Sequence, residues 1–324
     1  QFLYFIGAAM TSALRSSYTN VEIAKRFGAF CKEAGIVTRG IVKVGMTPRG
    51  LRGVVATKAI PVNETVIVVP DKAFMTAFDA LRNKDFVDNV CGGEFPLQVD
   101  DLRARIMGGF LYVHHVLLAY YMADTLLLGD HIDSTPLSES LSPIEKELKL
   151  TPNGGFNRYV DFLPRSEGNF QELRGILERT LRTWQLNEDL EGNLGARHRI
   201  SREDAREVVL WAIMMVLSRS LPIEHKGTLE RIFAKTDFLS LLEKEPTETQ
   251  YSIPVMCPLL DMVNHSNQNE NVVVMVPEDG MREMRPIVAR ALRPIAAGEE
   301  VTMRYGMTDP YGLKVFYGME DIFP

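Results

Sequence analysis

The side chains with the clearest chemical potential lie in two stretches near the C-terminal end. The first is an apolar run that leads through Asp261 to the pair Asn264 and His265, and the second, about forty residues later, ends at Tyr305. Asp261 and His265 are four residues apart, so on a helix they would share one face and could bind a metal ion together. No third ligand motif accompanies them, and the sequence therefore predicts no metal site.

A glycine-containing loop near the N-terminal end is a further candidate for contact with a ligand. It contains Gly50 and Gly53, separated by Leu51 and Arg52, and it leads into an apolar run that starts at Val54. Glycine has no side chain, so the backbone there can adopt positive φ and approach a ligand closely. Taken alone, the pattern indicates an ordinary glycine-containing hairpin, and only the other stretches favour a role in ligand binding.

In this order and spacing, the three stretches resemble the SET domain, the catalytic fold of protein lysine methyltransferases. The loop is similar to the N-terminal SET signature, whose backbone holds the methionine part of S-adenosylmethionine. The Asn-His pair is similar to the knot-like crossing of that fold, where backbone groups clasp the adenine and the Asn side chain faces the cofactor amine. The residues implied in cofactor binding are Gly50, Leu51, Arg52, Gly53, Asn264, His265 and Asp261, the last as a buttress of the turn.

The same resemblance implies that Tyr305 is the catalytic residue. A sulfonium gives its methyl group to a neutral amine in an in-line displacement, and positive charge moves from sulfur to nitrogen. A phenol oxygen near the methyl group and an aromatic face near the cation stabilise that charge without a covalent intermediate. Because free lysine has a pKa of about 10.4, the amine must lose its proton in a narrow apolar channel.

Other stretches resemble the Rubisco large-subunit methyltransferase branch of the family. An apolar helix ends at Ser218 and Arg219, which line the cofactor pocket in that branch, and a guanidinium suits the cofactor carboxylate. Residues 159–181 are similar to segments of the branch's helical insertion. Near the end, Tyr317 matches an aromatic wall of the channel or cofactor site, but Met319 replaces the usual second aromatic residue. The substrate residue and the degree of methylation therefore stay open.

The elements that must position these residues alternate between strand and helix patterns. Strands are expected at 40–44, 54–57, 65–69, 271–276, 285–289 and 300–304, and helices at 21–35, 102–123, 141–148, 170–186, 202–217 and 226–244. The expected fold class is therefore α+β, a SET β-fold interrupted by a large α-helical insertion. The expected parts are a leader (1–20), an N-terminal helix with the first SET part (21–75), the insertion (76–252) and the second SET part (253–324). The substrate-recruiting C-terminal lobe of the branch is expected to be absent or cut.

Composition excludes several classes of protein. The net charge of −6 provides no basic field for nucleic acid, and no apolar run reaches the roughly 20 residues of a membrane span. Three widely spaced cysteines suit a reducing compartment better than a disulfide framework. Residues 1–20 contain Arg15, several hydroxyl side chains and no acidic residue, so they form either a helical N-terminal extension or a transit peptide, of which this composition is typical. We expect a soluble intracellular protein, cytoplasmic or organellar (mitochondrial), with a protein substrate or protein complex as its partner.

Three functions compete on this sequence. The first is an S-adenosylmethionine-dependent protein-lysine N-methyltransferase acting on a non-histone protein, with a histidine methyltransferase as its close variant because imidazole needs less deprotonation near neutral pH. The second is a non-catalytic SET scaffold or assembly factor within a larger complex, such as an organellar one. The third is a helical binding module that contains these motifs by chance, and it predicts no contact between residues 47–57 and 258–266.

Overall fold

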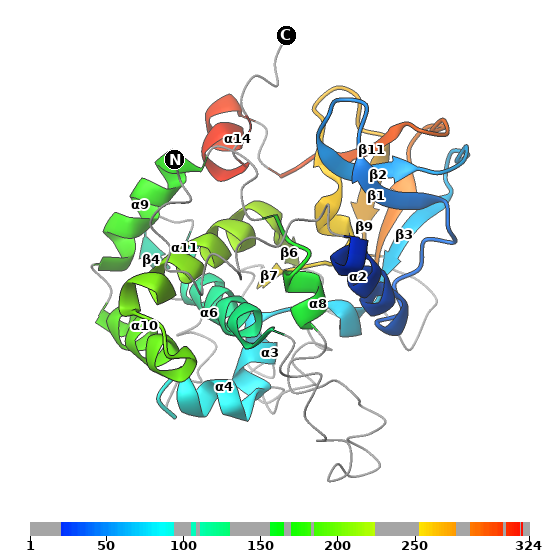
Figure 1. Ribbon diagram of the computed structural model, residues 1–324. Helices are drawn as coiled ribbons and strands as arrows, with labels where there is room; N and C mark the ends of the chain where they lie inside the picture. Colours follow the sequence, from blue (N-terminus) through cyan, green and yellow to red (C-terminus); the bar gives the residue numbers. More distant parts are fainter. Residues whose placement is uncertain are drawn as a thin grey trace, which may run out of the picture. The chain divides into compact units, whose positions relative to one another are not determined.

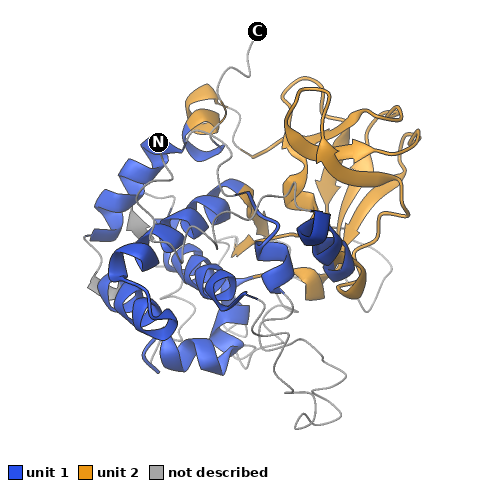
Figure 2. Cartoon of the chain, in the orientation of Figure 1, with its two compact units in different colours: residues 1–30, 76–218, 315–318 blue, residues 31–75, 219–314, 319–324 orange. Residues whose placement is uncertain are grey.

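The chain divides into two compact units, drawn in blue and orange in Figure 2. The helical unit contains residues 1–30, 76–218 and 315–318, and the strand-rich unit contains residues 31–75, 219–314 and 319–324. The computed structural model describes residues 21–93, 105–107, 111–129, 156–164, 170–182, 185–223, 253–276, 286–306, 309–317 and 319.

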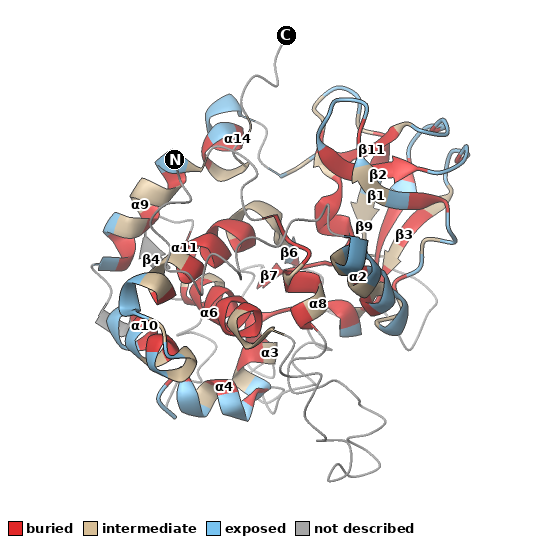
Figure 3. Ribbon diagram, in the orientation of Figure 1, coloured by how far each residue is buried: buried red, intermediate tan, exposed pale blue. Residues whose placement is uncertain are grey.

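Helix α6 (Val113–Leu128) is the central element of the helical unit. It is apolar on nearly all sides and almost wholly buried, as expected of a core helix rather than a surface one. It contacts α3, α8 and α10 (Figures 1 and 3). The other elements are α3 (Ala77–Arg82), α4 (Lys84–Asn89), β4 (Arg105–Met107), β5 (Leu111–Tyr112), α8 (Phe156–Val160), α9 (Gln171–Arg182), α10 (Gln185–His198) and α11 (Arg202–Arg219).

Two small sheets organise the strand-rich unit. One has the strand order β1-β2-β11-β8 and the other the order β3-β10-β9. Strand β2 is buried along its whole length between β1 and β11, because it lies in the interior of the first sheet. The strands are β1 (Val42–Met46), β2 (Arg52–Ala56), β3 (Thr65–Val69), β6 (Leu221–Ile223), β7 (Ile253–Val255), β8 (Asn264–His265), β9 (Val272–Met275), β10 (Ile287–Ala291) and β11 (Glu300–Met303).

Several short elements complete the chain. The 3-10 helix η4 (Leu260–Met262) precedes β8, and η1 (Asp71–Ala73) follows β3. Helices α2 (Val21–Glu33) and α14 (Pro310–Tyr317) contribute residues to both units.

None of the helices in the described stretches is long and apolar enough to cross a membrane. In the same part of the chain, no three His, Cys, Asp or Glu residues are grouped so that they could hold a metal ion.

The mixture of helices and short strands confirms the expected α+β class. One expected element was wrong: residues 102–123 were predicted as one helix, but β4 and β5 occupy residues 105–107 and 111–112, and helix α6 begins only at Val113. Gly108 and Gly109 interrupt the apolar pattern there, and their cost in a helix favours a break. The expected 170–186 helix ends at Arg182, and α10 was missed. The leader and the helices expected at 141–148 and 226–244 lie outside the described residues.

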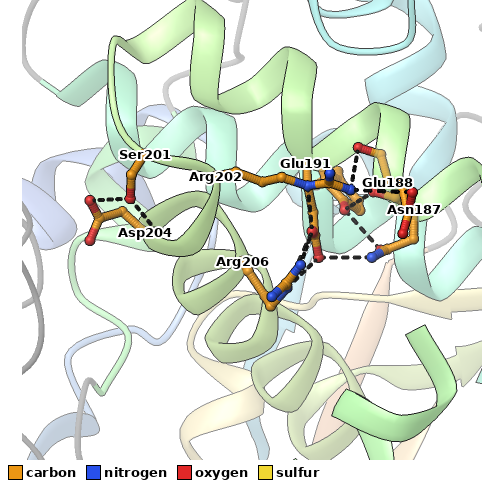
Figure 4. Close-up of polar contacts among 8 residues, drawn as sticks. Asn187, Glu188, Glu191, Ser201, Arg202, Asp204 and Arg206 are labelled. Atoms are coloured by element: carbon orange, nitrogen blue, oxygen red, sulfur yellow. Dashed lines mark hydrogen bonds and ion pairs between the residues drawn. The ribbon is translucent and has the colours of Figure 1, made fainter. Parts of the chain in front are cut away.

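A buried carboxylate joins α10 to α11 in the helical unit (Figure 4). Glu191 is 1% exposed and accepts hydrogen bonds from Asn187, Arg202 and Arg206. Asn187 in turn accepts a hydrogen bond from the Tyr120 hydroxyl of α6 at 2.8 Å. We expect Glu191→Gln to lower the free energy of unfolding by about 2–4 kcal/mol, because the amide replaces a charged acceptor with a donor inside this network. Urea unfolding of the variant measures this loss.

Glu188 provides the matched control. It lies one turn earlier on α10 and faces Arg202 at 3.8 Å, but its side chain is 54% exposed. Because exposed ion pairs contribute little, Glu188→Gln should change the free energy of unfolding by less than about 0.5 kcal/mol. Equal losses in the two variants would contradict the structural role given to Glu191.

His115 makes the stability of the helical unit dependent on pH. Its Nδ1 accepts the backbone N–H of Tyr112 at 3.3 Å at the start of α6, and burial lowers the pKa of the imidazole from 6.5 to about 4. The unfolded chain therefore binds the proton first as pH falls. The contribution of His115 is fully present above about pH 6.5 and is lost towards about pH 4, with a total on the order of 3 kcal/mol.

The variant His115→Gln tests this prediction. Glutamine at the third helical position can accept the same backbone N–H without titrating. We expect the free energy of unfolding of the wild type, measured relative to this variant, to fall between pH 6.5 and pH 4. Parallel pH profiles for the two proteins would show that His115 does not titrate in this way.

Candidate active site

The glycine-containing loop forms the tip of the hairpin between β1 and β2. In this pairing, Gly45 lies opposite Gly53, and the turn is closed by the N–H of Thr47 donating to Leu51 O at 2.7 Å. Gly50 has a φ of +73°, a conformation that favours glycine over other residues. Leu51 is exposed at the tip, whereas Arg52 is buried.

Gly53 is packed too closely for any side chain. A Cβ atom at this position would lie 2.5 Å from Asn264 Nδ2 and 2.8 Å from Thr47 Cγ2. The absence of a side chain therefore allows the Asn264 amide to approach the hairpin. This steric role is local, because a Cβ atom on Gly45, directly across the ladder, would meet nothing within 4 Å.

The segment from Asn264 to Asn271 wraps around strand β11. Strand β8 runs parallel to β11, with Asn264 opposite Thr302. The chain then turns back, and Asn271 both donates its N–H to Thr302 O and accepts the N–H of Thr302 on its side-chain oxygen. Since Asn271 is 1% exposed, these bonds are shielded from water. The crossing fixes the strand that leads to Tyr305.

The Asn264 side chain joins three segments that are distant in the sequence. Its Nδ2 donates to Arg52 O and to Glu300 Oε1, each at 2.8 Å. Its Oδ1 makes no hydrogen bond to the part of the chain that the structure describes. The amide therefore presents an acceptor to a ligand donor, which fits the sequence expectation that it faces a cofactor amine.

Both the side chain and the backbone of Tyr305 make hydrogen bonds to the Asn-His segment and the residue before it. Its hydroxyl donates to Val263 O at 2.9 Å, and its backbone N–H donates to His265 Nδ1 at 3.0 Å. The ring centroids of Tyr305 and His265 lie 5.0 Å apart. The hydroxyl hydrogen therefore points to the Val263 carbonyl, and the oxygen lone pairs point elsewhere.

The ring of His265 is neutral and fixed in one tautomer. Its Nδ1 accepts a backbone N–H, so Nε2 carries the hydrogen and donates to Asn267 Oδ1 at 2.9 Å. Burial, which is the largest cause, lowers the pKa of this imidazole below 6.5, and the nearby Arg304 lowers it further. Protonation of Nδ1 would break the bond to Tyr305, so the neutral ring positions the tyrosine backbone.

The side chain of Arg219 contacts the backbone of Asp261. One guanidinium nitrogen of Arg219 donates to Asp261 O at 2.9 Å, and Arg52 donates to the Met262 sulfur at 3.2 Å. The N–H of Asp261 donates to Cys257 O, which closes the turn before η4. Leu259 within that turn has a φ of +73°, which is unusual for a side chain of this size.

Most of the predicted site residues therefore belong to one unit and touch one another. The hairpin contacts the Asn-His segment through Arg52 and Asn264, and this contact contradicts the hypothesis of a helical module with chance motifs. Arg49 and Glu300 are additional residues of this site that the sequence motifs did not predict. Arg49 donates two hydrogen bonds to the Glu300 carboxylate, at 2.7 and 2.8 Å. Glu300 lies in the sequence stretch that ends at Tyr305, but nothing local in the sequence identifies its partner.

Ser218 and Tyr317 belong to the helical unit, and their expected cofactor contacts stay predictions. The Ser218 hydroxyl donates to Met214 O, one turn back in α11. Burial raises the pKa of Tyr317. Met319 belongs to the strand-rich unit, where its N–H donates to Leu313 O of α14.

Comparisons with known proteins identify the family. A model of the SET domain matches residues 51–306, so the chain belongs to the SET domain family. Its fold is similar to a crystal structure of the SET domain of LSMT bound to lysine and AdoHcy, with a TM-score of 0.50, 15% identity, and coverage of 94% of this chain and 58% of that chain. It is also similar to Rubisco LSMT bound to sinefungin and monomethyllysine, with a TM-score of 0.51, 15% identity, and coverage of 92% and 56%.

These findings confirm the SET fold and the likeness to the Rubisco LSMT branch that the sequence predicts. The chain spans less than three fifths of the length of the two solved chains. No curated protein matches it.

Proposed function

We propose that this chain is an S-adenosylmethionine-dependent methyltransferase that modifies a lysine side chain of a non-histone protein. The observation that carries the proposal is the double anchoring of Tyr305 beside the Asn-His pair. Its hydroxyl is bound to Val263 O and its backbone N–H to His265, so the phenol oxygen has a fixed place. Membership in the SET family supports methyl transfer as the reaction.

The residues of the strand-rich unit fit this cofactor. Asn264 presents a carbonyl oxygen to an ammonium group, and the space beside the Gly50 backbone is open, because a Cβ atom there would meet nothing within 4 Å. Arg219 provides a cation for a carboxylate. The two solved structures of similar fold are bound to AdoHcy with lysine and to sinefungin with monomethyllysine, which supports the choice of cofactor and substrate.

When bound, S-adenosylmethionine supplies a methyl group on a positively charged sulfur. Tyr305 stabilises positive charge as it moves from sulfur to the amine nitrogen, because its oxygen lone pairs attract that charge. The hydrogen bond to Val263 O prevents the phenol from turning its hydrogen towards the cation. His265 remains neutral and so holds the Tyr305 backbone in register. Most of the rate then comes from alignment of donor and acceptor.

Transfer of radioactive methyl groups to protein tests this function. The full chain is incubated with methyl-labelled S-adenosylmethionine and a pool of intracellular proteins, and the labelled proteins are hydrolysed to amino acids. We expect label in methyl-lysine. Label in methyl-histidine alone would overturn the lysine assignment, and cofactor binding without any transfer to protein would favour a scaffold.

A further inference from the structure

The carboxylate of Glu300 joins the two segments proposed to hold the cofactor. It starts strand β11, and its side chain is only 9% exposed. Arg49 in the hairpin turn donates through Nε to Oε2 at 2.7 Å and through a terminal nitrogen to Oε1 at 2.8 Å. Asn264 donates to Oε1 from the opposite segment, at 2.8 Å. One buried carboxylate therefore receives three N–H groups from two segments about 200 residues apart in the sequence.

The hairpin turn needs such an external support. Residues 48–51 are exposed, and the turn's internal backbone bonds are those from Thr47 N–H to Leu51 O and from Gly50 N–H to Thr47 O. Exposed segments with few buried contacts open most easily. A two-pronged guanidinium–carboxylate pair restrains direction as well as distance, so it can hold an exposed turn in one arrangement.

The same carboxylate fixes the Asn264 amide. Both Nδ2 bonds of Asn264 end on protein acceptors, one of which is Glu300 Oε1, and this arrangement leaves Oδ1 for a ligand. If Glu300 became neutral glutamine, one side-chain acceptor would become a donor facing Arg49 or Asn264. At least one of the three hydrogen bonds would be lost, and the amide of Asn264 could rotate.

We propose that Glu300 is a positioning residue that holds the 47–52 turn and the Asn264 amide in one arrangement, and that it thereby sets the affinity for S-adenosylmethionine. The link to affinity rests on the function proposed above. The ordering of the turn does not depend on it, since the contacts involve protein atoms alone.

The test compares Glu300→Gln with Glu299→Gln. Glu299 is the neighbouring residue of the same turn, but its carboxylate accepts the Ala296 N–H and a weak hydrogen bond from Asn271 Nδ2 at 3.3 Å and pairs with Arg293, none of which belongs to the hairpin. Amide hydrogen exchange of Thr47 and Gly50 reports the order of the hairpin turn. In Glu300→Gln we expect exchange at least about 10-fold faster at both amides, with a dissociation constant for S-adenosylmethionine at least about 10-fold higher. Glu299→Gln should leave both quantities within about 2-fold.

Variants of the partner separate positioning from overall stability. Because Arg49 is half-exposed, Arg49→Met should change the urea unfolding midpoint little and yet raise the dissociation constant about 10-fold. Arg49→Lys should restore part of the affinity, because a single cation can replace one of the two hydrogen bonds. Arg39→Met, which removes an exposed pair with Glu64, serves as the arginine control.

The exchange and binding measurements test the two parts of the proposal separately. Unchanged exchange at Thr47 and Gly50 in Glu300→Gln would overturn the proposal, whether or not the cofactor binds. Faster exchange with unchanged affinity, in a protein that binds the cofactor, would overturn the link to affinity. A wild type that binds no S-adenosylmethionine would contradict the proposed function and with it that link, while the exchange data still test the ordering of the turn.

Discussion

Replacing Tyr305 with phenylalanine should reduce the rate of methyl transfer about 100- to 1,000-fold while the dissociation constant for S-adenosylmethionine stays within about 3-fold. The phenol oxygen stabilises charge that develops only during transfer, so its loss acts on the transition state and not on cofactor binding. The aromatic ring and the backbone bond to His265 are retained in the variant. Single-turnover transfer of labelled methyl groups measures the rate, and calorimetry measures the affinity.

Tyr311 is the matched control for this substitution. It lies in α14 and is 62% exposed, so removal of its hydroxyl should leave the transfer rate within about 2-fold. If Tyr305→Phe retained more than a third of the wild-type rate, the phenol would have no catalytic role. A comparable loss in Tyr311→Phe would show that the assay does not report on the site.

Gly53→Ala should weaken the binding of S-adenosylmethionine at least about 100-fold. The added Cβ would lie 2.5 Å from Asn264 Nδ2, so the asparagine must rotate and lose its bonds to Arg52 O and Glu300. The overpacking should also lower the free energy of unfolding by about 1–3 kcal/mol. Calorimetry and urea unfolding on the same preparation separate the two effects.

Gly45→Ala tests whether the effect is specific. Gly45 pairs directly with Gly53 in the ladder, but a Cβ there would meet nothing within 4 Å. We therefore expect its affinity for the cofactor to remain within about 2-fold of the wild type. If both alanine variants bind as the wild type does, the close approach of Asn264 to the hairpin is unimportant for binding.

Local sequence patterns predicted the parts of the site that depend on local chemistry. Tyr305, Asn264 and His265 stand in short motifs at fixed spacing, and the structure brings them together within one unit. The glycine at position 53 was predicted for backbone approach to a ligand. The structure adds a protein contact as its steric reason, because the side chain it admits belongs to Asn264.

Contacts between distant segments could not be predicted in the same way. The pair between Arg49 and Glu300 joins residues 251 positions apart, and both residue types are common on surfaces. Helix α10 was missed because its buried positions are partly polar: Asn187 and Glu191 are buried through the network that they form with α11 and not through apolar periodicity. In each case, burial of a polar side chain depends on partners that only the folded chain supplies.

The most direct test of the whole account is calorimetry of S-adenosylmethionine with the full chain, wild type beside Asn264→Ala. We expect one saturable site in the wild type and a dissociation constant at least about 10-fold higher in the variant, because the variant loses the Oδ1 acceptor and both hydrogen bonds from Nδ2 to Arg52 O and Glu300. A folded wild type that binds no S-adenosylmethionine, or a variant that binds it equally well, would contradict the placement of the cofactor at this site.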